Sequence, residues 1–268
     1  MRPALLRCLC AAVALGVIAP AASADGGSEA DGLEEIERCI RANSPERTAV
    51  QRFRIADFDA SGEIRSIAGK LWWRRSDDGL SKISAHVDAP ADMRDSAFLL
   101  IENDGRNDMF VYLPEFRKTR RITSRTVSGS LFGTEFTYED FEHLRGIGGS
   151  AKRERLADTE HEGRPAYQLA AMPTPDSGSA YARIVSTIDR ETCVPLDVRF
   201  FSDAEELKKR LSVDPESITR EGGVWVSRRA TLANPSKQRE SRLEIVEVEL
   251  DVEVPKSFFS QSRLGRLK

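Results

Sequence analysis

Histidine, cysteine and long apolar runs are all scarce in this sequence of 268 residues. It contains three histidines and four cysteines, and the cysteines form no Cys-x-x-Cys pair. These small numbers argue against a metal site built from histidine or cysteine and against a Cys–His nucleophile. Beyond the first 24 residues, no segment approaches the roughly 18 uninterrupted apolar residues of a membrane-spanning helix, so we expect no such helix.

Catalytic signatures are also missing. The sequence has no Gly-x-Ser-x-Gly, His-Glu-x-x-His or phosphate-loop motif, each of which would point to a nucleophile, a metal or a phosphate. Its formal net charge of -3 lacks the positive excess on which a nucleic-acid module relies. We therefore expect no catalytic residues, no metal, no cofactor and no nucleic-acid partner, in a protein that is not an enzyme.

The overall composition is typical of a folded domain. Hydrophobic residues make up 40% of the chain and charged residues 31%, proportions that suit a globular protein with a substantial core. No change in composition marks a linker between domains. We therefore expect a single domain.

The first 24 residues have the pattern of a Sec-type secretory signal. Arg2 and Arg7 precede a short apolar run at 9–18, and a small-x-small sequence ends at Ala24. The run is too short and wrongly flanked for a membrane anchor. We expect cleavage after Ala24 and one exported, periplasmic domain that covers residues 25–268.

Cleavage at this point would leave two of the four cysteines, Cys39 and Cys193. In an oxidising compartment, two remaining cysteines most simply form one disulfide. Such a bridge would connect an N-terminal helix to a distant strand. The alternative is a pair of buried, unpaired thiols.

Hydrophobic periodicity predicts one early helix followed by many strands. Residues 31–43 have helical spacing, with Ile36 and Ile40 on one side. Further along, the period changes to two and turn residues recur regularly, which predicts an antiparallel meander. We expect 125–145 to be a loop leading into a short helix and 203–211 to form one or two helical turns. Such a mainly β chain is either a sandwich or a curled, barrel-like sheet.

Apolar residues alternate along the first strands so that one set shares a face of the sheet. That face either lines a cavity for an acyl or lipid ligand or belongs to a fully packed core. The members of the set are Phe53, Ile55, Leu71, Trp73, Ile83, Val87, Leu99, Ile101, Val111 and Leu113.

Acidic residues gather in the segment 125–145, at Glu135, Glu139, Asp140 and Glu142. Such a group could contain a general acid–base pair. Carboxylates of a solvated loop are the commoner case, and the sequence gives no nucleophile to accompany an acid and a base. We treat these residues as a solvated cluster.

Basic residues form a run just before that segment, at Arg117, Lys118, Arg120, Arg121 and Arg125. They fit two interpretations equally well. Arg120 and Arg121 could bind an anionic head group or dock a partner. The alternative is a charged edge strand that resists aggregation.

One stretch of the sequence resembles a known family. It combines Met-Phe-Val-Tyr-Leu-Pro at 109–114, Lys-x-Arg-Arg-Ile at 118–122, and Ser-x-Phe-Gly-Thr-x-Phe-Thr-Tyr-Glu-Asp-Phe at 130–141. These strings are similar to those of the outer membrane lipoprotein-sorting protein family. Within the LolA-like superfamily, the branch in question is associated with exporters of the resistance–nodulation–division (RND) type. Weaker similarity covers most of the mature chain.

The resemblance implies an incomplete antiparallel β-barrel, with an N-terminal helix and with plug helices or loops over a hydrophobic cavity. It implies a periplasmic carrier for a lipid, or for the acyl chains of a lipoprotein, on the way to the outer membrane. An inner-membrane RND-type exporter is the implied partner, and contact with the membrane would be peripheral or transient. The alternative is an accessory subunit of such a transporter that binds no lipid.

Within the resembling stretch, five residues are expected to build the plug. The glycine would allow a tight turn, and the aromatic residues would anchor the segment. We expect the whole segment 125–145 to act as a movable lid, with a fixed loop as the alternative. The five residues are Phe132, Gly133, Phe136, Tyr138 and Phe141.

Overall fold

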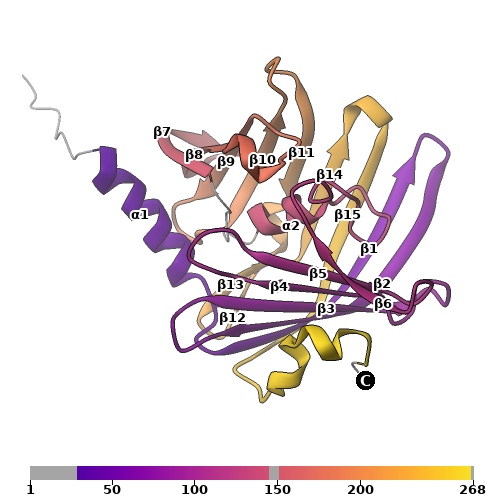
Figure 1. Ribbon diagram of the computed structural model, residues 1–268. Helices are drawn as coiled ribbons and strands as arrows, with labels where there is room; N and C mark the ends of the chain where they lie inside the picture. Colours follow the sequence, from indigo (N-terminus) through magenta and orange to yellow (C-terminus); the bar gives the residue numbers. More distant parts are fainter. Residues whose placement is uncertain (1–28, 145–150, 267–268) are drawn as a thin grey trace, which may run out of the picture.

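The computed structural model describes residues 29–144 and 151–266 of the chain (Figure 1). The expected signal peptide lies outside these ranges. Two α-helices are α1 (Glu29–Ala42) and α2 (Tyr138–Leu144), and five short 3-10 helices are η1 (Pro175–Ser177), η2 (Pro215–Ser217), η3 (Pro235–Lys237), η4 (Lys256–Phe259) and η5 (Gln261–Arg266). No helix within the described ranges is long and apolar enough to cross a membrane.

Strands make up most of the described chain. They are β1 (Thr48–Asp59), β2 (Gly62–Arg75), β3 (Ser81–Ala89), β4 (Ala97–Ile101), β5 (Asp108–Leu113), β6 (Lys118–Ile122), β7 (Ala151–His161), β8 (Arg164–Pro173), β9 (Arg183–Asp189), β10 (Pro195–Phe201), β11 (Leu207–Val213), β12 (Ile218–Glu221), β13 (Val224–Ser227), β14 (Arg229–Asn234) and β15 (Arg239–Leu250).

Thirteen of the strands form one antiparallel sheet in the order β6-β5-β4-β3-β2-β1-β15-β14-β11-β10-β9-β8-β7. The sheet curls around α2, and its edge strands β6 and β7 do not pair with each other (Figure 1). The remaining strands, β12 and β13, make a separate hairpin. The predicted incomplete antiparallel β-barrel with an N-terminal helix is confirmed.

Helix α1 lies against one end of the sheet, where it contacts β7 and β8. Its apolar side buries Ile36 in a small cluster with Tyr167 and Ile188. A disulfide joins Cys39 of this helix to Cys193 in the turn after β9, with a Cα–Cα distance of 5.4 Å. The helix is therefore attached covalently to the sheet that it covers.

The helical turns expected at 203–211 do not form, because strand β11 begins at Leu207. The turn before it contains Glu205 with a positive φ of 59°. Along β11, Lys209 and Leu211 are buried and their neighbours are exposed, so the period is two. The alternation was hidden in the sequence because one of the buried positions is a lysine.

Apolar side chains form two main clusters, one on each face of the curled sheet. The concave cluster extends over β1–β5, β9–β11, β14 and β15. The outer cluster lies beneath the C-terminal tail, where Val254, Phe259 and Leu264 cover Leu99 and Phe110. Eight of the ten residues predicted to share a face belong to or pack on the concave cluster: Phe53, Ile55, Leu71, Trp73, Ile83, Val87, Val111 and Leu113.

The other two predicted residues, Leu99 and Ile101, lie on the opposite face and in the outer cluster. The pairing of β3 with β4 places Leu100 opposite Ile83, so Leu100 takes the concave position. Strand β4 is apolar at every position because the C-terminal tail covers its outer face. Such a strand has no alternation from which its inner face could be read.

Candidate functional site

The plug, residues 123–144, fills the concave side of the sheet. Its buried members Val127, Leu131, Phe132, Phe136 and Tyr138 belong to the concave cluster, and Phe141 packs against it. The ring of Phe98 on β4 lies 5.5 Å from the Tyr138 ring and 5.4 Å from the Phe141 ring, measured between centroids. The apolar face predicted from the strands is therefore covered by the predicted plug aromatics.

A tight turn at the tip of the plug depends on Gly133. Its φ is 78°, and Phe132 before it also has a positive φ of 55°. A Cβ atom at Gly133 would lie 2.4 Å from Nη1 of Arg65 on β2. A glycine here provides both the left-handed backbone conformation and the space for the arginine.

Helix α2 begins with a capping box. The Thr137 amide donates to the Asp140 carboxylate at 2.8 Å, and the Asp140 amide donates to the Thr137 hydroxyl at 3.1 Å. Both donors are thereby satisfied inside the protein. The cap also fixes the direction of the Asp140 side chain, which is completely buried.

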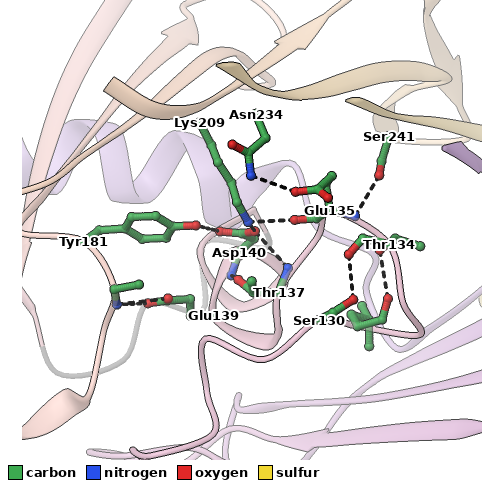
Figure 2. Close-up of polar contacts among 12 residues, drawn as sticks. Ser130, Thr134, Glu135, Thr137, Glu139, Asp140, Tyr181, Lys209, Asn234 and Ser241 are labelled. Carbon is green, nitrogen blue, oxygen red and sulfur yellow. Dashed lines mark hydrogen bonds and ion pairs between the residues drawn. The ribbon is translucent and has the colours of Figure 1, made fainter. Parts of the chain in front are cut away.

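Asp140 accepts hydrogen bonds from two residues of the barrel wall (Figure 2). The Tyr181 hydroxyl donates to Oδ1 at 2.7 Å, and Lys209 Nζ donates to Oδ2 at 2.7 Å. Lys209 also donates to the Glu135 carbonyl oxygen at 2.6 Å. A buried ion pair of this kind is costly to break, because one charge would remain without its partner.

Glu135 forms a second polar centre of the plug, closer to the surface. Its carboxylate accepts from Asn234 Nδ2 at 2.7 Å and from Lys237 Nζ at 3.1 Å, and Arg239 lies 3.5 Å away. The Glu135 amide donates to the Ser241 hydroxyl at 2.9 Å. These partners belong to β14, η3 and β15.

Two further plug carboxylates are also buried. Glu139 accepts from the Ser179 hydroxyl at 2.6 Å and from the Ala180 amide at 3.1 Å, and Glu142 accepts from Asn107 Nδ2 at 2.5 Å. Burial raises the pKa of Glu139, and it raises the pKa of Glu142 to about 7. The interpretation of the acidic residues as a solvated cluster is therefore wrong.

The buried carboxylates of the plug act as hydrogen-bond acceptors that attach the plug to the rest of the protein. The four plug carboxylates accept hydrogen bonds from residues of β11, β14 and η3, from the β4–β5 loop and from the segment before β9. Within residues 29–144 and 151–266, no three or more His, Cys, Asp or Glu side chains are placed to hold a metal ion. The arrangement is suited to holding the plug in the barrel.

Two hollows lie near the plug. A small one of about 30 Å³ is lined by residues that include Glu139, Glu142 and His143. A wide one of about 850 Å³ opens between the tip of the β1–β2 hairpin and the tip of the β14–β15 hairpin. Asn234 and Arg239, which hold Glu135, are among the residues that line the wide hollow.

The two arginines predicted for a head group or a docking surface lie on β6, an edge of the sheet. Arg120 pairs with Val111 and Arg121 with Phe110, so the two side chains are on opposite faces. The Arg120 guanidinium stacks at 4.1 Å over the ring of Phe116, and Arg121 forms an ion pair with Asp108. The structure does not bring the two together at one point.

Sequence reasoning missed the partners of the plug, among them Tyr181, Lys209 and Asn234. One signal was available for Lys209, because it stands two residues before Leu211 and four before Val213 on the buried side of β11. A lysine in phase with buried apolar residues indicates a buried cation.

Comparison with known proteins identifies the family. A model of a family described as an uncharacterized protein matches residues 79–266, more than half of the chain. A domain from Vibrio parahaemolyticus assigned to outer membrane lipoprotein sorting has a TM-score of 0.80 and 22% identity, covering 89% of this chain and 100% of that one. A LolA superfamily protein from Nitrosomonas europaea has a TM-score of 0.64 and 15% identity, covering 85% and 97%. The chain belongs to the family of that model, and its fold is LolA-like.

A further similar structure is that of a DUF1329 family protein from Desulfovibrio piger. Its TM-score is 0.79 at 18% identity, and the match covers 88% of this chain and 98% of that one. A comparison with curated proteins found no significant match. At such identities the likeness shows the LolA-like fold.

Proposed function

We propose that this LolA-like protein is a periplasmic carrier that binds a lipid, or the acyl chains of a lipoprotein, without chemical conversion. The observation that carries the proposal is the concave cluster. It lines the inner face of an open sheet, and it is closed over by the plug in place of a layer of helices. The signal-like first 24 residues support export, and the LolA-like fold supports the carriage of a lipid.

Binding on this face requires the plug to move. The plug aromatics occupy the apolar surface that an acyl chain would use, so ligand and plug compete for it. Each methylene that leaves water contributes about 0.8 kcal/mol, so a chain of about twelve methylenes contributes about 10 kcal/mol. That is comparable to what several buried aromatic side chains contribute. For the apolar contacts alone, an exchange of plug for ligand is therefore close to balanced; the polar contacts of the plug favour the closed state.

The first test is to purify the protein from the periplasm and to combine native mass spectrometry with lipid extraction. The proposal predicts a stoichiometric lipid or acylated peptide. A ligand-free mass, together with no binding of acyl-chain probes, would contradict the proposal. It would favour the alternative of an accessory subunit that docks to an RND-type exporter.

A pair of variants on β15 tests where the acyl chain of the ligand binds. Leu243 is half-buried against the concave cluster and lies opposite Ile55, whereas Val246 is 61% exposed on the same strand. We expect Leu243→Glu to weaken acyl-chain binding, because the chain would meet a charge on the inner face. Val246→Glu is the matched control and should bind as the wild type does. If the two variants bind acyl-chain probes with equal affinity, the acyl chain binds somewhere other than the concave face.

A further inference from the structure

At two carboxylates of the plug, side chains from outside the plug supply positive charge and hydrogen-bond donors. Five side chains from beyond the plug donate hydrogen bonds or present positive charge to two of its carboxylates. Asp140 receives Tyr181 and Lys209, and Glu135 receives donors from β14, η3 and β15. The donors are Tyr181, Lys209, Asn234, Lys237 and Arg239, three of which Figure 2 labels. The donors lie on strands of the sheet or in segments next to them, whereas the carboxylates belong to the plug.

Lys209 is the buried cation among these donors. Among the buried residues of the described chain it is the single lysine or arginine, with 7% of its surface exposed. It shares the face of Leu211 and Val213, which belong to the concave cluster. Its ammonium group bonds to Asp140 and to the Glu135 carbonyl, both of the plug. When the plug leaves, a cation stays behind in an apolar setting.

A charge in that setting needs a new partner. Both hydrogen-bond acceptors of the Lys209 ammonium group, the Asp140 carboxylate and the Glu135 carbonyl, belong to the plug and leave with it. The ligand that replaces the plug must therefore bring an anion of its own.

We infer that these donors form a binding site for the anionic head group of an acyl-chain ligand, and that Asp140 and Glu135 occupy this site while the plug is in place. The inference rests on the proposed function and specifies its ligand. The ligand combines an apolar chain for the concave cluster with a carboxylate or a phosphate for Lys209 and its neighbours. A neutral lipid would leave the lysine unpaired.

The wide hollow lies beside two of the donors. It measures about 850 Å³, within the range of small-molecule pockets, which is about 300 to 1,000 Å³. Asn234 and Arg239 line it and also hold Glu135. An anion in this hollow would meet the side chains of Asn234 and Arg239.

Three ligands with the same ten-carbon chain test the inference: decanoate, decyl phosphate and decanol. Their affinities are measured by isothermal titration calorimetry with the full mature protein at about pH 8. We expect the wild type to bind one or both anions at least about tenfold more tightly than decanol, a difference of about 1.4 kcal/mol. The two anions distinguish a carboxylate ligand from a phosphate ligand.

The decisive variant is Lys209→Met, which removes the charge and keeps an apolar stem. We expect the preference for the anions over decanol to fall several-fold, with the remainder due to Lys237 and Arg239. Lys208→Met is the matched control, because Lys208 is the exposed neighbour on the same strand, and it should keep the wild-type preference. Lys209→Arg should also keep it, which a merely structural role for the lysine would not require.

Asp140 variants complete the design. Asp140→Asn removes the competing anion, so the anionic ligands should bind several-fold more tightly than to the wild type. The double variant Lys209→Met with Asp140→Asn leaves no unpaired charge buried and guards against a folding defect in the single variant. It should bind decanol, and it should prefer the anions less strongly than Asp140→Asn does.

The outcomes separate the two claims. Equal affinities for decanol and both anions in the wild type and in Asp140→Asn would overturn the head-group site and leave the carrier proposal intact. No binding of any of the three ligands, even to Asp140→Asn, would overturn both. An anionic preference that Lys209→Met leaves undiminished in a folded protein would also refute the site.

Discussion

Replacing Glu142 with glutamine is expected to change how the free energy of unfolding depends on pH. Glu142 is 7% exposed and accepts a hydrogen bond of 2.5 Å from the Asn107 amide. Burial raises the pKa of its carboxyl to about 7, because a buried carboxylate has lost its hydration. The folded protein therefore keeps a proton on Glu142 at pH values where the unfolded chain, with the ordinary pKa of 4.5, has released it.

The sign and size of the effect follow from this difference. Between pH 4.5 and about 7 the folded state binds more protons than the unfolded state, so the free energy of unfolding falls as the pH rises. At about 1.4 kcal/mol for each pKa unit, the loss amounts to about 3 kcal/mol. Glutamine is neutral throughout and keeps an oxygen for the Asn107 amide. The variant should match the wild type near pH 4.5 and exceed it by about 3 kcal/mol near pH 8.

Urea denaturation of both proteins, at several pH values between about 4.5 and 8, gives the difference directly. Subtracting the wild-type free energy of unfolding from that of the variant at each pH removes the titration of groups that do not interact with Glu142. Glu160→Gln is the control, because Glu160 is exposed on β7, and it should show no such difference. A Glu142→Gln curve that runs parallel to the wild type at all pH values would refute the reasoning.

Three further predictions concern other parts of the molecule. Burial lowers the pKa of His143 to about 4, so His143→Asn should remove a loss of stability that the wild type suffers on acidification from pH 6.5 to 4, as the same titration would show. Phe98→Ala should lower the free energy of unfolding by about 3 to 5 kcal/mol, measured by urea denaturation, because Phe98 is fully buried and stacks on Tyr138. Serine at both Cys39 and Cys193 should cost about 5 kcal/mol by loop entropy, since the bridge spans 154 residues; an unchanged melting curve would contradict this.

The meander of the first strands could be predicted because each has one covered face. Leu71 and Trp73 alternate with Lys70 and Arg74, and this pattern is enough to place them on the concave side. Alternation fails where both faces are covered. The inner face of β4 depends on its register with β3 and on a tail more than a hundred residues further along the chain, and neither is visible in the strand itself.

The plug could be predicted as a segment but not as a network. Its aromatic residues and its short helix follow from local sequence, and the family resemblance points to the same stretch. The burial of its carboxylates depends on distant partners, because Lys209 is 69 residues from Asp140 and Asn234 is 99 residues from Glu135. A carboxylate in a loop stays solvated unless the fold brings a hydrogen-bond donor next to it. Only the three-dimensional structure shows which distant residues do so.

The order of strands in the sheet has a consequence for how the chain folds. β1 pairs with β15, so Ala49 meets Leu250 and Ile55 meets Leu243 in the middle of the sheet. The strands on either side of this seam can form from local hairpins, whereas the seam joins nearly the two ends of the domain and should close late. Until β15 has been made, β1 is an open edge that another chain could pair with. A polypeptide cut between β14 and β15 would therefore lose one strand and also present an aggregation-prone edge where the finished protein has its centre.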